Sequence, residues 1–545
     1  MINKILIWTF LLTSLLSCGQ SENNINSGNR LGILHWGNGT EPQELDPHIV
    51  TGVPEHNILS TLLEGLVRKN PANLEAVPGV AESWTISEGG TVYTFKLRDS
   101  ARWSNGDPVT SEDFRWSYWR AMQPALGNRY AYMFYPIKNA EAYLKGDLKD
   151  FDEVGIKALD PLTLEITLAN PTPYFLQLLD HQSYFPVHRG TIENFGQPDE
   201  RGTRWTRPGN FVGNGAFKLQ EWKLNKRIDV VKNNQYWDAG NVNLNSIRFY
   251  PTENVSTEER MFRAGQLHVT GTIPIDKIDV YKRDHPELLR IAAYLGTYYY
   301  RFNVDKPPYN DKRVRTALNL AIDRKQIVER VTKGEQLPAT TFTPPETLGY
   351  TAKSEIEFKP EKARLLLAEA GYPNGEGFPI TSLLYNTSEG HRKIAVAIQQ
   401  MWKKHLNIDI TLNNQDWKVY LDSVNSGNYD ISRAGWIGDY VDPNTFLDMW
   451  ITDGGNNQTG WSNTRYDEII TRIAPATANR AQRYQLFQEA ESILLDELPI
   501  IPIYIYTSIS LAHPSVKGLT NNILNYTSYQ SLSLTPETTV QETTH

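Results

Sequence analysis

The chain has 545 residues, of which 40% are hydrophobic and 21% are charged, so a chain that is disordered throughout is excluded. At roughly 150 residues per domain, this length predicts about three to four domains. The formal net charge of −8 argues against nucleic acid as the main partner, because phosphate binding requires clustered cations. The 14 Trp, 28 Tyr and 18 Phe residues suit wide recognition surfaces as well as a large core.

The N-terminus has the pattern of an export signal. Lys4 precedes an apolar run from Ile5 to Leu16, which is too short to span a membrane as a stable helix. The only cysteine of the chain, Cys18, follows Leu-Leu-Ser, and this sequence resembles the bacterial lipobox. We therefore predict a lipoprotein signal peptide at 1–17, lipidation of Cys18, and a polar, flexible tether over 18–30. The alternative is an ordinary export signal with an incidental cysteine.

Alternation of apolar and polar residues predicts the strands of the first half. Val92–Leu97 and Thr163–Leu168 have the pattern of half-buried strands. Ala216–Trp222 and Arg227–Val231 are close enough in sequence to form a hairpin. No repeat of fixed period is present, which excludes solenoids and propellers.

Helical spacing is clearest in the second half. Apolar residues recur at helical intervals in Arg313–Val331, Lys359–Gly371 and Ala481–Leu495. Leu498–Tyr506 is apolar but broken by two prolines, and it is predicted to be a buried strand. The fold class is therefore α/β or α+β with several sheets.

Catalytic motifs are missing from the sequence. It contains no phosphate-binding loop, no G-x-S-x-G nucleophile motif and no H-E-x-x-H zinc motif. The 11 histidines include no pair at three- or four-residue spacing, and the single cysteine excludes an internal disulfide and a C-x-x-C site. We predict no catalytic residue, no metal site and no cofactor. A hydrolase with a pair of carboxylates stays open, because such a pair forms in space and not in sequence.

Three segments carry a family resemblance: Tyr298–Asn303 with Lys306–Arg324, Arg433–Phe446, and Pro78–Trp84 with the residues up to Phe114. The similarity extends to Gly52–Glu55, Asn214–Phe217, Asn386–Ser388 and Pro502–Tyr504. Together they resemble the oligopeptide-binding proteins of bacterial peptide ABC importers, which belong to the extracellular peptide- and nickel-binding type of solute-binding protein. The resemblance covers about residues 35–530.

The resemblance implies an α/β fold of the type II periplasmic-binding-protein kind, in which two lobes close around a ligand. It implies a lobe I made of residues 31–63, 188–293 and 507–540, with an extra domain at 64–187. Lobe II would comprise residues 294–506. A few interlobe crossings would absorb the rotation between the lobes.

The charged binding residues are also carried over from the resemblance. Asp439 matches the aspartate that receives the α-ammonium of a peptide, although its surroundings also suit a turn. Arg433 matches an arginine of the cleft, and its guanidinium suits a carboxylate or an internal ion pair. His391 matches a histidine near the ligand carboxyl end. Arg330 falls where relatives have a lysine that reaches the carboxylates of other ligands, with Lys333 as a nearby competitor and a solvated helix face as the alternative.

Uncharged residues complete the predicted peptide site. Trp417 and Trp436 match tryptophans that line side-chain pockets, although either ring could belong to the core. The remaining candidates are Gly435, Val53 with its backbone groups, Tyr130 and Tyr504. Two positions depart from the family: Val424 replaces a second arginine nine residues before Arg433, and Thr51 replaces a frequent acid.

We therefore predict a lipid-anchored receptor of the cell envelope that binds oligopeptides and delivers them to an ABC permease and its ATPases. It would act outside the cytoplasm as a monomer, with no enzymatic activity and no nucleic acid partner. The alternatives are a receptor of the same fold for a metal complex, an opine or a sugar, and a secreted hydrolase with a carboxylate pair.

Overall fold

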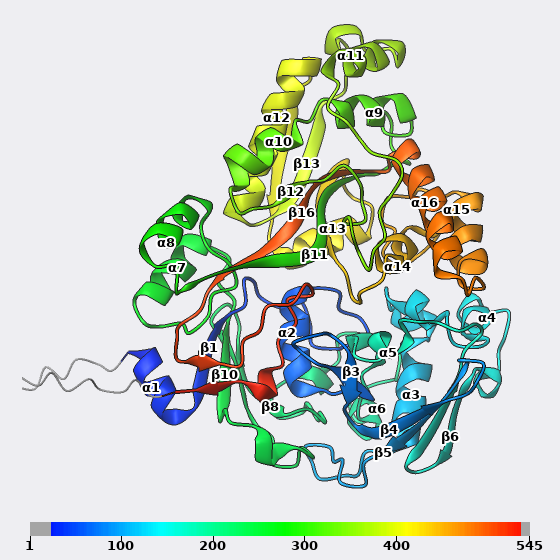
Figure 1. Cartoon of the computed structure of the whole chain (residues 1–545), viewed down its shortest axis with the longest axis vertical. Helices are drawn as coiled ribbons and strands as arrows, with labels where there is room; N and C mark the ends of the chain where they lie inside the picture. Colours follow the sequence, from blue (N-terminus) through cyan, green and yellow to red (C-terminus); the bar gives the residue numbers. More distant parts are fainter. Residues whose placement is uncertain (1–22, 536–545) are drawn as a thin grey trace, which may run out of the picture.

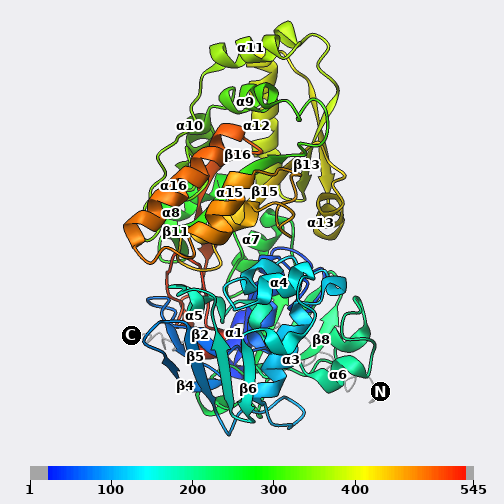
Figure 2. The same cartoon turned by 90° about the vertical axis from the view of Figure 1, so that its right-hand side faces the viewer.

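The computed structural model describes residues 23–535 and arranges them in two lobes stacked along the long axis of the molecule (Figure 1). The first lobe contains a four-stranded sheet of order β1-β10-β9-β8, and the second lobe contains a six-stranded sheet of order β12-β16-β11-β15-β13-β14. A third sheet, β4-β5-β7-β6, forms an extension beside the first lobe (Figure 1). Figure 2 shows the same two-part arrangement from the side.

The strands have the following bounds. Those of the first lobe are β1 Ile33–Gly37, β8 Phe217–Lys223, β9 Arg227–Lys232 and β10 Ser246–Tyr250. Those of the second lobe are β11 Leu289–Phe302, β12 Leu337–Pro338, β13 Thr381–Asn386, β14 Ile410–Gln415, β15 Ile431–Ile437 and β16 Ile500–Leu511. Those of the extension are β4 Ala81–Ile86, β5 Val92–Leu97, β6 Ile156–Asp160 and β7 Thr163–Thr167. Two short pairs complete the set: β2 Val67–Lys69 with β3 Ala76–Pro78, and β17 Val516–Lys517 with β18 Ser533–Leu534.

Helices cover the sheets of both lobes. The first lobe and the extension contain α1 Asn24–Leu31, α2 Val53–Leu62, α3 Ser111–Ala121, α4 Ala140–Lys145, α5 Phe175–Leu178, α6 Arg189–Glu193, α7 Val255–Arg263 and α8 Ile278–Asp284. The second lobe contains α9 Lys312–Leu320, α10 Arg324–Gln326, α11 Pro360–Glu369, α12 Glu389–Leu406, α13 Trp417–Asn425, α14 Asn444–Leu447, α15 Thr464–Glu468 and α16 Arg480–Glu497. In both views α11 lies at the end of the second lobe that is distant from the first (Figures 1 and 2).

The lobes are joined by the long antiparallel pair β11 and β16. Their lower halves pair from Leu289 with Leu511 to Ala293 with Thr507, where Leu511 packs in a cluster of the first lobe. Their upper halves form the centre of the second lobe's sheet, where β11 also pairs with β15. Between the halves the register shifts, so that residues 294–296 face Tyr506 alone. This bulge lies where the chain passes from one lobe to the other, and a bulge of this kind bends and twists a strand pair.

Most elements predicted from periodicity are confirmed. The alternating segments form β5 and β7, and the predicted hairpin is the antiparallel pair β8 and β9. Two of the predicted helices are α11 and α16, and the apolar segment with two prolines is β16. In β5, β7, β8 and α11 the buried face carries the periodic apolar residues, whereas β16 is buried on both faces over Ile500–Ile505.

Two predictions of local structure are wrong. The helix predicted over Arg313–Val331 is divided, because α9 ends at Leu320 and the Asp323 side chain accepts the N–H of Gln326 at 3.0 Å, which starts a new helix. The tether predicted through residue 30 is replaced by α1 from Asn24 onward. Ile25 of α1 is buried and donates its N–H to the carbonyl of Gly265 at 3.0 Å, so this segment is fixed to the first lobe.

Predictions for the termini fall partly outside residues 23–535. The signal peptide at 1–17, the lipidation of Cys18 and the end of the chain beyond residue 535 lie outside the described residues. Within 23–535, no helix combines the length and the apolar composition that crossing a membrane requires.

Candidate ligand-binding site

Asp439 lies just after β15, at the boundary between the second lobe and the extension. Its N–H donates to the hydroxyl of Thr445 at 3.1 Å, which holds the turn. Its Oδ1 is 3.5 Å from Nε2 of His181, next to α5 of the extension. Its Oδ2 is buried and has no hydrogen-bond partner among the described residues. A buried carboxylate oxygen without a donor costs free energy, so this oxygen is a ready acceptor for a cationic ligand group.

Arg433 lies on β15, and its guanidinium is held by neutral groups. Nη1 donates to Asn386 at 3.2 Å, and Nη2 donates to the hydroxyl of Tyr506 at 2.8 Å. The guanidinium also lies 4.8 Å from the ring centroid of Tyr298, while Nε is buried without a partner. Within residues 23–535, no carboxylate forms an ion pair with Arg433. Because an arginine stays protonated, this half-buried positive charge is available to an anion from elsewhere.

His391 lies beside this arginine at the start of α12. Its Nδ1 is 3.5 Å from the hydroxyl of Tyr298, and the two rings are in contact. Burial lowers the pKa of His391 well below its ordinary value, and the positive charge of Arg433 lowers it further. The imidazole is therefore neutral at physiological pH and acts as a polar hydrogen-bonding group, not as a second cation.

Tryptophan and tyrosine rings surround these charged groups. Trp436 is buried, donates its indole N–H to the carbonyl of Thr445 at 2.6 Å, and lies 6.1 Å from the ring of Tyr130 in the extension. Trp417, at the start of α13, stacks on Tyr420. Its indole lies 3.3 Å from Oε1 of Glu55 in the first lobe, which makes it an interlobe contact. The rings thus come from both sides of the lobe boundary.

The other predicted residues have mixed positions. Val53 begins α2, is 46% exposed and lies two residues from Glu55. A Cβ at Gly435 would clash with the Tyr506 hydroxyl, so glycine permits that hydroxyl to reach Arg433. Tyr504 is buried and stacks on Tyr298 with 4.7 Å between ring centroids, which places it in the core beneath Arg433. Arg330 is exposed on a π-helical turn, Ile327–Thr332, and the structure shows no contact between it and the other candidates.

Three residues near the boundary were not predicted. His181 contacts Asp439, although nothing in its sequence surroundings marks it. Glu55 belongs to the matching segment Gly52–Glu55 without a predicted role of its own, yet it contacts Trp417 and accepts the N–H of Gln43 at 2.6 Å. Burial raises the pKa of Glu55 and those donors oppose the increase. Arg301 on β11 is a buried arginine close to α13, the helix in which Val424 is buried.

Polar contacts join the two lobes. Glu389 on α12 accepts from Asn254 and from Ser256 at the start of α7, each at 3.2 Å. The backbone N–H of Val441 donates to Gln177 at 2.8 Å, linking the second lobe to the extension. These contacts require the lobes to be close together. The structure therefore represents a closed arrangement.

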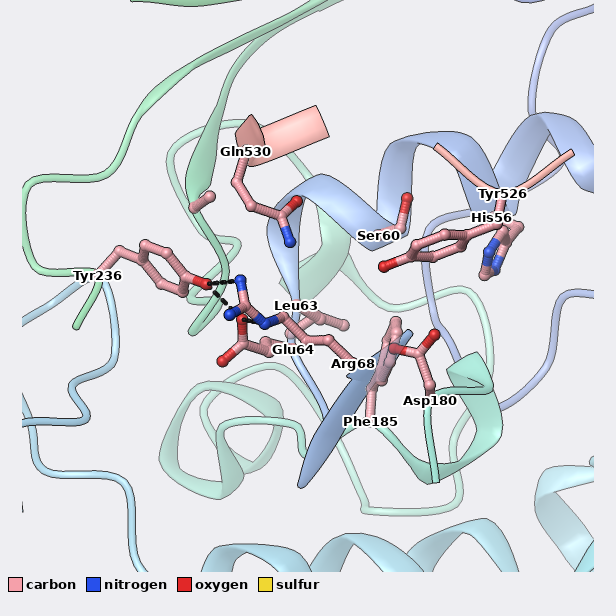
Figure 3. A pocket seen from close by; sticks show the side chains of 11 residues that line it. His56, Ser60, Leu63, Glu64, Arg68, Asp180, Phe185, Tyr236, Tyr526 and Gln530 are labelled. Carbon is pink, nitrogen blue, oxygen red and sulfur yellow. Dashed lines mark hydrogen bonds and ion pairs between the residues drawn. The ribbon is translucent and has the colours of Figure 1, made fainter. Parts of the chain in front are cut away.

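A separate group of charged residues lies where the extension joins the first lobe (Figure 3). We call Glu64, Arg68, Lys69 and Asp180 the balanced cluster. Lys69 contacts Asp180 at 3.0 Å, Arg68 contacts Glu64 at 3.7 Å, and Trp237 donates to Glu64 at 2.6 Å. The adjoining cavity has about 20 Å³, room for about one water molecule. It is too small for a solute, and no group of residues suited to hold a metal occurs within 23–535.

Two lobes joined by one ribbon, with charged and aromatic groups gathered at their boundary, define a two-lobed solute-binding protein. The profile of the bacterial extracellular solute-binding proteins, family 5 (middle region), matches residues 75–458, and the chain belongs to this family. The α/β two-lobed fold and the resemblance that the sequence segments carry are thereby confirmed. A binding protein and not an enzyme was predicted, and membership of this family confirms it. The family description also places its members outside the cytoplasm.

Three relatives show how far the similarity extends. The periplasmic oligopeptide-binding protein OppA of Salmonella typhimurium is 39% identical over 531 residues, covering 95% of this chain and 96% of the relative. The structure of Haemophilus influenzae OppA in complex with the peptide RPPGFSPFR matches with a TM-score of 0.88 at 35% identity, over 92% of this chain and 99% of that one.

The third relative is the murein tripeptide-binding protein MppA, of which two structures, one of them from Escherichia coli, match at 37% identity. One matches with a TM-score of 0.88, over 92% of this chain and 98% of that one. Its unliganded open form matches with only 0.62, over 92% and 97%. The lobes of the present chain are therefore not in that open arrangement, in agreement with the interlobe contacts.

Proposed function

We propose that this protein is an extracytoplasmic receptor that binds oligopeptides between its lobes and delivers them to an ABC permease with its ATPases. The observation that carries the proposal is the pair of incomplete charges in a closed cleft. Asp439 keeps one buried oxygen without a donor, and Arg433 has no acidic partner among residues 23–535. A peptide has one ammonium and one carboxylate, which match these two groups.

Main-chain recognition would make the receptor tolerant of sequence. The upper part of β15, which carries Arg433 and Gly435, ends two residues before Asp439, so an extended ligand can lie along it with its amino end at the aspartate. Trp436, Trp417 and Tyr130 would border the side-chain pockets. The OppA and MppA relatives are named for the peptides they bind, which supports this ligand class.

Native mass spectrometry combined with calorimetry tests the ligand class. Protein purified without added ligand should carry peptides of mixed sequence, and stripped protein should bind trialanine much more tightly than N-acetyl-trialanine. Release of peptide fragments during incubation would indicate a hydrolase instead. Binding of a metal complex, an opine or a sugar without any peptide binding would overturn the proposal.

We also propose that Cys18 carries a lipid that anchors the protein to the cell envelope, and that the receptor is a monomer with the lobe and domain boundaries that the sequence predicts from residue 31 onward. The support for the anchor is the position of the only cysteine directly after an export signal. Cys18→Ser should abolish membrane retention in a detergent-partition experiment, because durable anchoring requires the acyl chains. Equal retention of the variant and the wild type would refute it.

A further inference from the structure

Arg301, near the end of β11, is a buried arginine whose positive charge has no acidic partner among residues 23–535. It is 7% exposed. Nη1 donates to the side-chain oxygen of Gln458, and Nη2 donates to the hydroxyl of Tyr420 at 3.3 Å. Its Nε is buried without any hydrogen-bond partner. A buried cation is normally paired, since desolvating an unpaired charge is costly.

Other buried arginines of the chain, in contrast to Arg301, donate either to a carboxylate or to several backbone carbonyl groups. Arg120 forms a two-point contact with Asp46 at 2.7 and 3.1 Å, and Arg483 forms one with Asp442 at 2.8 Å on both sides. Arg315 is 4% exposed and donates to three backbone carbonyl groups, those of Tyr309, Glu497 and Leu498. Arg301 has neither a carboxylate nor a set of carbonyls.

A second incomplete polar group faces Arg301. Ser432 on β15 is its direct partner in the antiparallel register, so both side chains lie on the same face of the sheet. The hydroxyl of Ser432 is fully buried and has no hydrogen-bond partner. Two donors without acceptors therefore lie side by side. The same face carries Trp436, opposite Thr297, and this ring packs near Tyr130 of the extension.

The surroundings of Arg301 are positively charged. Arg129 of the extension reaches across the boundary and donates to the carbonyl of Gly455 at 2.8 Å. Burial lowers the pKa of Arg129, and the positive charges of Arg201 and Arg301 lower it further. Within residues 23–535, none of these three arginines forms an ion pair with an acid. Arg129 and Arg301, neither of which has an acidic partner within residues 23–535, therefore lie close to each other at the boundary with the extension.

The position of Arg301 also relates to Val424. Val424 is buried on α13 in a cluster with Leu384, Tyr420, Leu421 and Tyr429, and α13 itself contains no arginine. Tyr420, one helical turn before Val424, accepts the hydrogen bond of Arg301 and donates its own hydroxyl to the carbonyl of Arg433. Arg301 thus places a guanidinium against the helix that lacks one.

We propose that Arg301, together with the hydroxyl of Ser432, receives a carboxylate of the bound ligand. This inference rests on the proposed function, and it assigns to the receptor a preference for an acidic group at this place. The carboxylate would come either from an acidic ligand side chain or from the carboxyl end of a short peptide. The free Nε–H of Arg301 and the Ser432 hydroxyl donate to its two oxygens.

Calorimetry on full-length, ligand-stripped protein tests the assignment. In the first arm, each position of trialanine is replaced in turn by Glu or by Gln, and the affinities of the two peptides are compared. In the second arm, the affinity of dialanine is compared with that of its C-terminal amide. The wild type should prefer the acid in one arm by about ten- to a hundredfold, and that arm identifies the source of the carboxylate. Arg301→Met should abolish the preference while binding of the neutral ligands persists.

Arg315→Met is the matched control, because it removes an equally buried arginine of the second lobe that is satisfied by backbone carbonyls. It should retain the preference. If Arg301→Met does not fold, Arg301→Lys keeps the charge but lacks the Nε–H, and its preference should fall below that of the wild type. An undiminished preference in either Arg301 variant, or none in the wild type, would overturn the inference. Failure of the wild type to bind any peptide would instead overturn the proposed function.

Discussion

The balanced cluster, beside the first lobe, and the cleft between the lobes both contain buried charged groups. They differ in whether these groups have partners of opposite charge within the chain. In the balanced cluster, Lys69 meets Asp180 and Arg68 meets Glu64, so each cation has an anion of the same chain. In the cleft, Asp439, Arg433 and Arg301 each keep at least one buried polar atom without a partner. Figure 3 shows the Arg68 guanidinium beside the Glu64 carboxylate and the Tyr236 hydroxyl.

Whether a buried charge has a partner within the chain distinguishes charges that stabilise the fold from charges that are available to bind a ligand. Removing one member of a completed pair leaves the other buried and alone, which costs folding free energy. Removing a member of an incomplete set costs little in the free protein, because its partner comes with the ligand. The four predictions below use this contrast, from the largest expected effect to the smallest.

Lys69→Met should reduce the free energy of unfolding by about 3–5 kcal/mol, because Asp180 would remain buried without its cation. Urea unfolding of the ligand-free protein measures this effect. The double variant Lys69→Met with Asp180→Leu should recover part of the loss, since both charges are then removed. If Lys69→Met is as stable as the wild type, the ion pair of Lys69 and Asp180 does not contribute to the free energy of unfolding.

Asp439→Asn should weaken ligand binding and leave the stability of the ligand-free protein nearly unchanged, the reverse of what is expected for Lys69→Met. We expect trialanine binding to weaken by about 2–5 kcal/mol, because the ligand ammonium would be buried without its carboxylate. The unfolding free energy of the ligand-free variant should stay close to that of the wild type. Calorimetry with free and N-acetylated trialanine checks the reason, since the variant should no longer distinguish the two. A variant that still prefers the free amine would rule out Asp439 as its receptor.

Buried neutral histidines in both lobes should make the protein less stable in acid. His48 of the first lobe accepts from Arg120 at 3.0 Å, and burial, with the positive charge of Arg120, lowers the pKa of His48 to about 4. The unfolded state therefore binds more protons below pH 6.5, and stability is lost as the pH falls from about 6.5 toward 4.

Urea unfolding between pH 7.5 and 4.5 measures this loss. His48→Gln should show a pH dependence shallower than that of the wild type by up to about 1.4 kcal/mol per pH unit. His391, in the cleft of the second lobe, is also kept neutral, so His391→Gln provides a comparison in the other region. Identical slopes for the wild type and His48→Gln would contradict the neutral state of His48.

Glu389→Gln should have the smallest effect, because it alters a contact between the lobes without emptying the site. The glutamate accepts from Asn254 and Ser256 across the boundary, and a neutral amide would be a weaker acceptor. We expect peptide affinity to fall by about 0.5–1.5 kcal/mol, or roughly two- to tenfold. Glu82→Gln on the exposed side of β4 is the control and should bind like the wild type. Equal affinities for all three proteins would exclude a contribution of Glu389 to closure.

Elements defined by local patterns were predictable from the sequence. Strand β5 and the hairpin of β8 and β9 depend on alternation within a few residues, and α11 and α16 depend on helical spacing. The break after α9 was missed because apolar spacing continues across it, while the cap at Asp323 that interrupts it is a single hydrogen bond. Parallel pairing of β1 with β10 joins residues more than 200 positions apart, and local patterns carry no information on it.

In the candidate site too, residues marked by a local sequence segment were predictable and residues that depend on tertiary contacts were not. Asp439 and Arg433 belong to one segment with a distinctive sequence, and the structure brings both to the lobe boundary. His181 and Arg301 were not recognised, because their importance depends on what surrounds them. An arginine in an alternating strand is equally compatible with solvent, and only the tertiary structure shows that Arg301 is buried without an acid.

The bulge between the lobes has a mechanical consequence. Residues 294–296 face Tyr506 alone, and the hydroxyl of Tyr506 accepts a hydrogen bond from Arg433 at 2.8 Å. The guanidinium of Arg433 is therefore one hydrogen bond away from the strand segment at which the chain passes between the lobes. A ligand that draws on this guanidinium also acts on the connection whose bending sets the relative position of the lobes.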